Sequence, residues 1–386
     1  MGVLSAQALA GIAAYKYKPG QYTWLDLQLN HYWNFMVELL PLSMAPNLVT
    51  LTGTVIMTVT TGSLLAMCPQ FTTAAPAWAY IVCGLGLFVY QTLDAIDGKQ
   101  ARRTNSSSPL GQLFDHGCDA LSTLVNMLSA VAALELGPSY SAYATICTVS
   151  VAFYLAQWEE YHTGTMSCGN GYFGVTEGQL VLVFVHLWTA AVGGAFWHQP
   201  APYLPYTFAE VLVCSLVLSN VILAYTNVSN VFRAPAHQLE GEELGNKQVS
   251  KAIALAQLFP PFAVTLAGYL LIAAYKAQYD AYPLLFLVPI GLSFVMFSSR
   301  MIVSHMCKVP FTPQFRILMP LIALLLATYY KVEFFADVHP LAALVGYCSI
   351  VVFIYFHYML SVVFEICAHL KIPLLTLPAK AATKAD

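Results

Sequence analysis

Four aspartates within 26 residues are the side chains of this sequence best suited to do chemistry. Asp94, Asp97, Asp115 and Asp119 are half of the eight aspartates in the 386-residue chain, and they stand in mostly apolar surroundings. Ionised carboxylates in such surroundings are unfavourable unless a cation pairs with them. Because no cysteine and histidine set accompanies these oxygens, they suit Mg²⁺ or Mn²⁺ better than zinc. Four negative charges therefore predict a site for two divalent ions.

The spacing of the aspartates predicts how they come together. Asp94 and Asp97 are three residues apart, and Asp115 and Asp119 are four apart, which places each pair on one face of a helix. The segment between the pairs, residues 103–109, is polar and suits a turn. Two helices joined by this hairpin would bring all four carboxylates to one site.

Small residues and an arginine lie between the aspartates of this hairpin. Gly98, Ala101 and Gly111 would let a bulky ligand lie against the backbone, although tight helix packing also explains small residues. Arg102, one turn after Gly98, offers a fork of donors that fits phosphate oxygens. Carboxylates, divalent ions, small residues and an arginine together indicate a diphosphate site.

The composition places these residues in a membrane protein. Charged residues make up 9% of the chain, whereas a soluble surface needs about 25%. Hydrophobic residues make up 58%, and the net charge of −3 leaves no basic surface for a nucleic acid. We therefore predict an all-α polytopic membrane protein with about ten transmembrane helices. The predicted spans are residues 47–67, 78–98, 112–134, 140–158, 178–197, 207–227, 250–274, 284–306, 315–330 and 340–366.

The lysines and arginines are divided unevenly between the two sides that these spans define. Ten spans put both termini on one side, and fourteen of the sixteen cations fall on that side. Only Lys276 and Lys331 fall on the other side. Since cations mark the cytosolic side of a membrane protein, we expect both termini and the aspartate hairpin to face the cytosol.

The segments outside the spans complete the predicted organisation. Residues 22–43 mix aromatic, acidic and aliphatic side chains, which suits an amphipathic helix in the headgroup layer or an ordinary packed surface helix. The predicted parts are a cytosolic N-terminus with this helix (1–45), a catalytic core of six spans (46–230), a cytosolic loop (231–249), four additional spans (250–370) and a cytosolic tail (371–386).

The aspartate hairpin also carries a family resemblance. Residues 97–119 match, without a departure, the D-G-x2-A-R-x8-G-x3-D-x3-D signature of the CDP-alcohol phosphotransferases, with Asp94 three residues upstream. Four further stretches resemble the eukaryotic choline and ethanolamine phosphotransferases, with the plant and algal enzymes nearest. They are Pro46-Asn47-Leu48, WEEYHTGT at residues 158–165, Thr176-Glu177-Gly178 and RMIVSHM at residues 300–306.

The resemblance implies a phospholipid-synthesising transferase. Such enzymes move phosphocholine or phosphoethanolamine from CDP-choline or CDP-ethanolamine to diacylglycerol and release CMP. The resemblance further implies a six-helix catalytic core, a homodimer, and a location in endoplasmic reticulum or Golgi membrane.

The resemblance also assigns roles to residues. It implies that Asp94, Asp97, Asp115 and Asp119 hold two Mg²⁺ ions, with Mn²⁺ as a possible substitute. It places Arg102 on a phosphate oxygen and Asn47 on the nucleotide, although an asparagine at a helix start is often a cap. Asn105, in the hairpin, is a second candidate for the nucleotide.

The proton acceptor is a separate question. Asp119 is the family's traditional candidate, but a metal ligand is a poor base. On an ideal helix His116 lies about 100° from Asp115 and about 60° from Asp119, so its imidazole faces the same site. We predict His116 as general base, with Glu177 as its carboxylate partner. The aromatic and acidic residues at 158–161 suit a quaternary ammonium or, alternatively, an interfacial belt.

Other readings of the aspartates remain. A prenyltransferase would also hold Mg²⁺-diphosphate, but with two Asp-rich motifs far apart in the chain. A transferase that uses CDP-diacylglycerol resembles the six-helix core alone. An ion-coupled transporter leaves the spacing of Gly98, Ala101, Arg102 and Gly111 unexplained.

Overall fold

The computed structural model describes residues 2–13, 15, 23–167, 169, 173–234, 251–330 and 338–378. Within these ranges the regular elements are helices, and the β-structure is one isolated bridge between Pro200 and Thr207. The helices are α1 (Ala6–Ala13), α2 (Trp24–Glu38), α3 (Pro46–Met67), α4 (Ala77–Arg103), α5 (Pro109–Ala133), α6 (Tyr140–Thr163), α7 (Val175–Val192), η1 (Gly194–His198), α8 (Phe208–Arg233), α9 (Lys251–Ala256), α10 (Phe259–Ala274), α11 (Lys276–Ala281), α12 (Leu284–Met306), η2 (Phe315–Leu318), α13 (Met319–Tyr329) and α15 (Pro340–Leu370).

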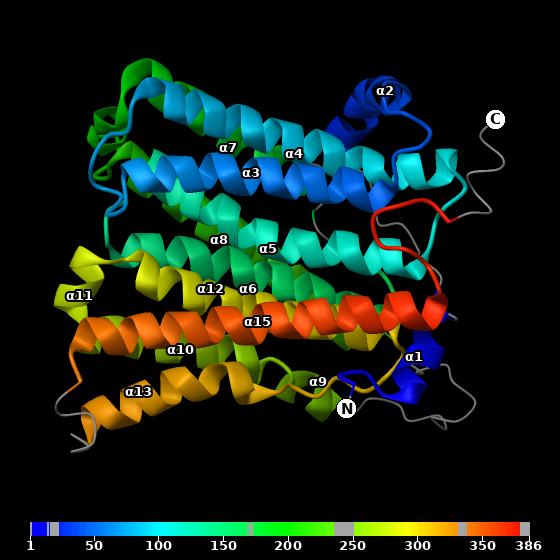
Figure 1. Cartoon of the computed structure of the whole chain (residues 1–386). Coiled ribbons are helices and arrows are strands. Elements are labelled where there is room, and N and C mark those ends of the chain that lie inside the picture. The colour runs from blue at the N-terminus through cyan, green and yellow to red at the C-terminus, as the bar shows by residue number, and fades with distance from the viewer. Residues whose placement is uncertain are drawn as a thin grey trace.

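The long helices lie side by side in one bundle, and their connections gather at its two ends (Figure 1). α3 packs on α4, α4 on α7, and α6 on both α8 and α12. α12 lies inside the bundle, because 89% of its most apolar 18 residues are buried. α8 lies on the outside with Leu218, Val221 and Tyr225 exposed, which suits contact with lipid chains.

Local signals in the sequence set the ends of several helices. Pro46, Pro109 and Pro340 occupy the first turns of α3, α5 and α15, where a missing N–H costs nothing. Ser108 Oγ caps α5 by accepting from Gly111 N at 3.1 Å. α6 ends at Thr163 and is followed by Gly164, whose φ of 71° is left-handed and favours glycine.

Each predicted span coincides with a helix or a pair of helices. Seven helical segments of the described chain are long and apolar enough to cross a membrane. These are Pro46–Met67, Ala77–Arg103, Val175–Val192, Phe208–Arg233, Lys251–Ala274, Leu284–Met306 and Pro340–Leu370. α5 and α6 are not among them, although they contain 25 and 24 residues, since they carry polar residues into the bundle.

α2 forms within the predicted N-terminal segment. Thr23 and Asp26 close a capping box at its start, and Trp33 and Val37 pack against Ile96 of α4. Trp24, Leu27 and Phe35 are exposed on its other side. The position of α2 in the headgroup layer stays a prediction. The predicted loop at 231–249 falls mostly outside the described residues, as do the last eight residues of the tail.

The cations of the described chain follow the predicted asymmetry. α4, α8 and α15 end at or beside Arg103, Arg233 and Lys371, and α9 begins at Lys251. These helix ends lie together at one end of the bundle, whereas α11, which begins with Lys276, lies at the other (Figure 1).

Candidate active site

The predicted hairpin is the turn between α4 and α5. α4 ends at Arg103, and Asn105 adopts a left-handed φ of 52° before Ser108 starts α5. Asp94 and Asp97 therefore stand in the last turns of α4, and Asp115 and Asp119 in the first turns of α5. The two helices that the spacing predicted are confirmed.

Three of the four carboxylates form a cluster suited to a cation. Asp94, Asp115 and Asp119 each offer one oxygen, and these oxygens lie within 4.8 Å of one another. The Oδ1 atoms of Asp94 and Asp115 are buried and accept no hydrogen bond from the described residues. Buried carboxylate oxygens without a donor are unfavourable unless a cation binds them, so this donor set fits Mg²⁺ or Mn²⁺.

Hydroxyl groups of neighbouring helices donate hydrogen bonds to Asp97 and Asp119. Thr50 Oγ1 of α3 donates to Asp97 Oδ2, and Tyr90 OH of α4 donates to Asp119 Oδ1 at 2.8 Å. Asp97 lies outside the three-residue cluster and lines the neighbouring cavity instead. Its predicted role as a metal ligand stays a prediction.

A cavity of about 410 Å³ opens beside the cluster. Eight of the predicted site residues line it: Asn47, Asp94, Asp97, Gly98, Ala101, Arg102, Gly111 and Asp115. The predicted residues Asn105, His116, Asp119 and Glu177 are not part of its wall. Residues that the sequence interpretation missed also line it: Tyr15, Pro46, Ala95, Lys99, Ser106, Ser107, Ser108, Pro109 and Gln112.

The glycines in the cavity wall keep space for a ligand. A Cβ on Gly98 would lie 3.7 Å from Nη1 of Arg102 and near no atom of another helix. A Cβ on Gly111 would lie 3.4 Å from Asn47 Oδ1. Tight helix packing thus does not account for Gly98, and its lack of a side chain leaves room beside the Arg102 guanidinium.

Asn47 is held by the segment that follows α15. Its Nδ2 donates to the carbonyl oxygen of Leu374 at 2.9 Å, which leaves Oδ1 near Gly111 in the cavity wall. The N-cap of α3 is Ala45, two residues earlier. Asn47 is therefore not a capping residue, and its Oδ1 is available as an acceptor.

His116 is buried behind the cavity wall. It is 6% exposed, and its Nε2 lies 3.3 Å from Nε2 of Gln112, which lines the cavity. Because an amide nitrogen only donates, Nε2 of the imidazole is the acceptor of this contact.

The carboxylate that the structure brings near His116 is Glu160. Glu160 of α6 is close enough for its charge to interact with that of His116, and its Oε1 lies 3.8 Å from Nε2 of His305. Glu177 has other partners: Oε1 accepts from Thr23 Oγ1 at 2.6 Å and Oε2 from Gly174 N at 2.7 Å. The pairing of Glu177 with His116 stays a prediction.

The aromatic residues at the end of α6 are buried. Trp158 and Tyr161 are at most 1% exposed, and Trp158 Nε1 donates to Gln257 Oε1 at 3.2 Å. The interfacial-belt alternative for these residues is therefore wrong. They also lie outside the cavity wall.

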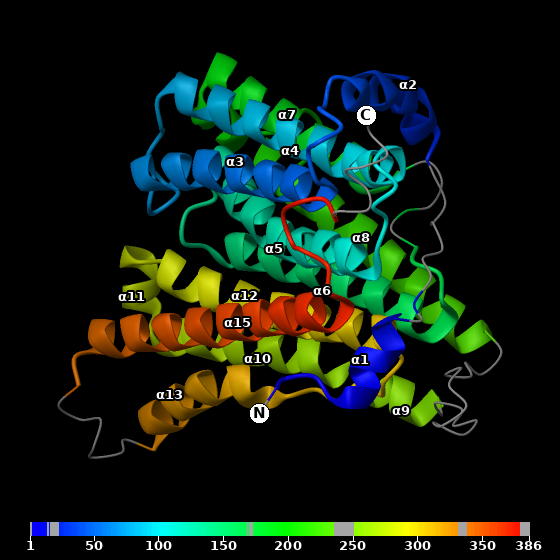
Figure 2. The ribbon, with the colours of Figure 1, turned by 45° about the vertical axis from the view of Figure 1, so that its right-hand side comes forward.

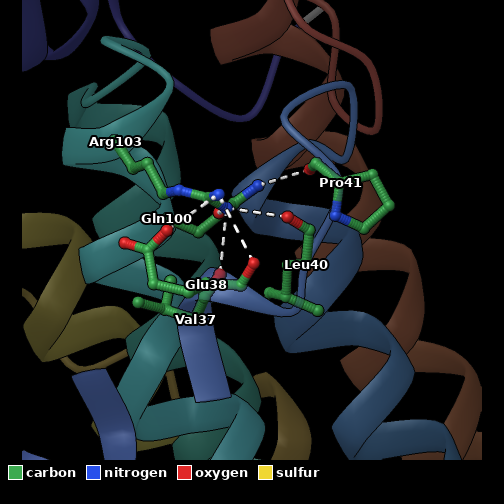
Figure 3. Close-up of polar contacts among 6 residues, drawn as sticks. All are labelled: Val37, Glu38, Leu40, Pro41, Gln100 and Arg103. Atoms are coloured by element: carbon green, nitrogen blue, oxygen red, sulfur yellow. Dashed lines mark hydrogen bonds and ion pairs between the residues drawn. The ribbon is translucent and has the colours of Figure 1, made fainter. Parts of the chain in front are cut away.

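Polar contacts anchor α2 and its connection to α3 on the end of α4 (Figure 3). Arg103 Nη1 donates to the carbonyl oxygens of Val37 at 2.9 Å and Leu40 at 2.7 Å, and its Nη2 lies 3.1 Å from Glu38 Oε2. Gln100 Nε2 donates to the carbonyl oxygen of Pro41 at 2.9 Å. These contacts fix the chain that leads into Asn47.

Known proteins share both the hairpin and most of the chain. The model of the CDP-alcohol phosphatidyltransferase family matches residues 43–198. Cholinephosphotransferase 1 of Homo sapiens is 37% identical over 311 residues, which cover 79% of this chain and 74% of the relative. Choline/ethanolaminephosphotransferase 1 of Arabidopsis thaliana is 35% identical over 390 residues, covering 95% and 96%.

This chain belongs to the CDP-alcohol phosphatidyltransferase family. Another relative, an uncharacterized CDP-alcohol phosphatidyltransferase class-I family protein of Dictyostelium discoideum, is 32% identical and covers 98% of the chain. The family match begins at residue 43 and ends at residue 198, so it includes Asn47 and the whole aspartate hairpin but not Tyr15. The family assignment that the signature suggested is confirmed.

Proposed function

We propose that this protein is a diacylglycerol choline/ethanolamine phosphotransferase. It transfers phosphocholine or phosphoethanolamine from the CDP derivative to diacylglycerol, which yields phosphatidylcholine or phosphatidylethanolamine and CMP. The observation that carries this proposal is the cluster of Asp94, Asp115 and Asp119 beside a polar cavity, within a chain whose relatives are named for this activity.

The residues of the cavity would bind the diphosphate of the donor. Asp94, Asp115 and Asp119, with Asp97 beside them, would hold Mg²⁺, which when bound neutralises diphosphate charge. Arg102 would donate to phosphate oxygens, and Gly98, Ala101 and Gly111 would leave room for the nucleotide. Asn47 Oδ1 would accept a hydrogen bond from the cytosine amino group or a ribose hydroxyl.

The transfer needs an acceptor for one proton. A bond forms between the diacylglycerol oxygen and the phosphorus that carries choline or ethanolamine, and the bond from that phosphorus to the CMP oxygen breaks. The hydroxyl proton goes to His116 Nε2, the nitrogen that already accepts from Gln112. Before the transfer the neutral imidazole carries its single N–H proton on Nδ1, and afterwards both nitrogens are protonated. Glu177, or Glu160, whose charge interacts with that of His116, would stabilise the imidazolium.

The proposed membrane arrangement has ten crossings. Seven of the crossings are the long apolar segments. The other three are α5, α6 and the shorter apolar helix formed by η2 and α13. The end of the bundle that holds the cavity would face the cytosol, since most of the described cations lie at that end. We also propose a homodimer and residence in the endoplasmic reticulum or Golgi membrane, on the family resemblance alone.

The test is a donor competition with purified protein in diacylglycerol-containing vesicles. Mg²⁺-dependent CMP release from CDP-choline or CDP-ethanolamine is expected, and their competition would give the headgroup preference. Release of no CMP from either donor would contradict the proposal and favour a transporter or another diphosphate transferase.

A further inference from the structure

The short helix α1 docks on the end of the bundle that carries the cavity. Ala6–Ala13 contacts α12 and α15, and Figure 2 shows α1 beside the end of α15. Ala8 and Ile12 are buried in the contact, whereas Ala10 is exposed. α1 lies 30 residues or more before the family match, which begins at residue 43.

A carboxylate of α15 clamps the start of this segment. Glu365 Oε1 accepts from Val3 N at 2.6 Å, and Oε2 accepts from Leu4 N at 2.8 Å. Glu365 forms no ion pair with a described cation. Hydrogen bonds from backbone N–H groups to a carboxylate are among the stronger ones, so both oxygens are used to hold the N-terminal segment.

The backbone of α1 lies directly on the end of α12. A Cβ added to Gly11 would lie 1.9 Å from the carbonyl oxygen of Cys307 and 2.6 Å from its carbonyl carbon. Real Cβ atoms do not approach a backbone carbonyl that closely. Only glycine permits this contact, since any side chain would push α1 away from α12.

The chain leaves α1 toward the catalytic cavity. Tyr15, two residues beyond the end of α1, is one of the residues that line the cavity with Asn47, Arg102 and Asp115. Its ring forms a T-shaped contact with the ring of His305, with the centroids 5.7 Å apart, and His305 Nε2 lies 3.8 Å from Glu160 Oε1. The N-terminal segment thus contributes Tyr15 to a cavity whose other lining residues come from α3, α4, α5 and the turn between α4 and α5.

We propose that α1 is a positioning element for donor binding. Glu365 and Gly11 hold α1 in place so that Tyr15 closes the cavity against the CDP-alcohol. This inference rests on the proposed function, because it takes the CDP-alcohol as the ligand of the cavity. Tyr15 is assigned to the CDP-alcohol and not to diacylglycerol, so the KM for diacylglycerol serves as the internal comparison.

The decisive variant is Gly11→Ala, with Ala10→Val as its matched control. Alanine is a better helix former than glycine, so a loss of function in Gly11→Ala cannot come from a weaker α1. We expect Gly11→Ala to raise KM for the CDP-alcohol about tenfold, with kcat and the KM for diacylglycerol within about twofold of wild type. Ala10→Val, on the exposed side of the same helix, should behave as wild type.

A double-mutant cycle tests whether Gly11 acts through Tyr15. Tyr15→Ala should raise KM for the CDP-alcohol, and Tyr15→Phe should restore most of the affinity by keeping the ring. If Gly11 positions Tyr15, the double variant Gly11→Ala/Tyr15→Ala is no worse than Tyr15→Ala alone. Glu365→Gln, which loses the carboxylate clamp, should shift KM in the same direction.

Three outcomes separate this inference from the proposed function. Wild-type protein that releases no CMP from any CDP-alcohol overturns the proposed function and this inference with it. Active wild type with an unchanged KM in Gly11→Ala overturns this inference alone. Multiplying effects of Gly11→Ala and Tyr15→Ala also overturn it, because they would show that the two residues act separately.

Discussion

The carboxylates of Asp94 and Asp115 combine two properties that seldom occur together in a folded chain. They lie within 4.8 Å of each other and of Asp119, and each has a buried oxygen that accepts no hydrogen bond from the described residues. Negative charges that lie so close together and so poorly solvated repel each other strongly. A bound divalent cation would replace this repulsion with attraction between the cation and each carboxylate.

Metal affinity therefore depends on each of these carboxylates. Asp94→Asn and Asp115→Asn should each weaken Mn²⁺ binding by more than about tenfold, since they remove a charged ligand. Electron paramagnetic resonance of added Mn²⁺ measures this directly. Asp280→Asn, an exposed aspartate of α11, is the control. Unchanged Mn²⁺ binding in both site variants would contradict the metal assignment.

The assignment of His116 as proton acceptor leads to a second prediction about a single residue. His116→Ala should lower kcat by about 10²- to 10⁴-fold, the usual contribution of a general base, while binding of CDP-choline persists. His31→Ala, an exposed histidine of α2, is the matched control. Turnover of His116→Ala within a few-fold of wild type would exclude His116 as the base.

The aspartate spacing and the signature were enough to predict the hairpin and seven residues of the cavity wall, and the family resemblance at residues 46–48 added Asn47. They could not predict Thr50, Tyr90 or Glu160 as neighbours of the carboxylates and His116, because these contacts depend on how one helix is rotated against the next, which residue spacing within a helix does not show. Glu160 lies in the stretch 158–165 that resembles the family, so this stretch could have indicated Glu160 as a site residue. No such stretch indicated Tyr15.

Helices are the scale at which the sequence was most informative. Apolar runs predicted the positions of α3, α4, α7, α8, α12 and α15, since a bilayer fixes both their length and their composition. α1 was missed because eight mostly apolar residues show no period that separates a docked helix from a loop.

The two glutamates considered as partners of His116 belong to different helices, Glu160 to α6 and Glu177 to α7, and they lead to a prediction at the scale of the helix. Glu160→Gln should slow turnover about tenfold without changing the thermal midpoint, because an amide no longer stabilises the imidazolium. Glu177→Gln should instead lower stability by about 1 kcal/mol, since Glu177 caps α7 and binds Thr23 of the α2 start. Turnover and thermal unfolding of both variants check this.

The reverse result would revive the pairing predicted from the sequence. If Glu177→Gln slowed turnover at full stability and Glu160→Gln did not, Glu177 would be the partner of His116. Glu210→Gln, which alters an equivalent capping box at the start of α8, controls for the effect of a lost cap.

The few charged residues are distributed unevenly over the whole molecule. Residues that are exposed on α3, α8 and α15 are largely apolar, as expected of a surface in lipid. Most of the described cations gather with the cavity at one end of the bundle, and Lys276 of α11 lies at the other end. The count of cations per side could be read from the sequence. The burial of α5, α6 and α12 in the interior could not, because hydropathy does not separate lipid contact from protein contact.

Metal binding should stabilise the bundle as a whole. Mg²⁺ that binds the folded protein at 100 times its dissociation constant adds about 2.7 kcal/mol to the free energy of unfolding. The thermal midpoint of wild type should therefore rise with Mg²⁺, and that of Asp94→Asn should not. An equal rise in both proteins would place the stabilising ion elsewhere.

The central claim is that the aspartate cluster serves transfer from a CDP-alcohol. The most direct measurement is CMP release by purified protein supplied with CDP-choline or CDP-ethanolamine and diacylglycerol, before and after EDTA. We predict that wild type releases CMP, stops in EDTA and recovers with excess Mg²⁺, while Asp115→Asn stays inactive throughout. CMP release that persists in EDTA, or in Asp115→Asn, would contradict this account of the site.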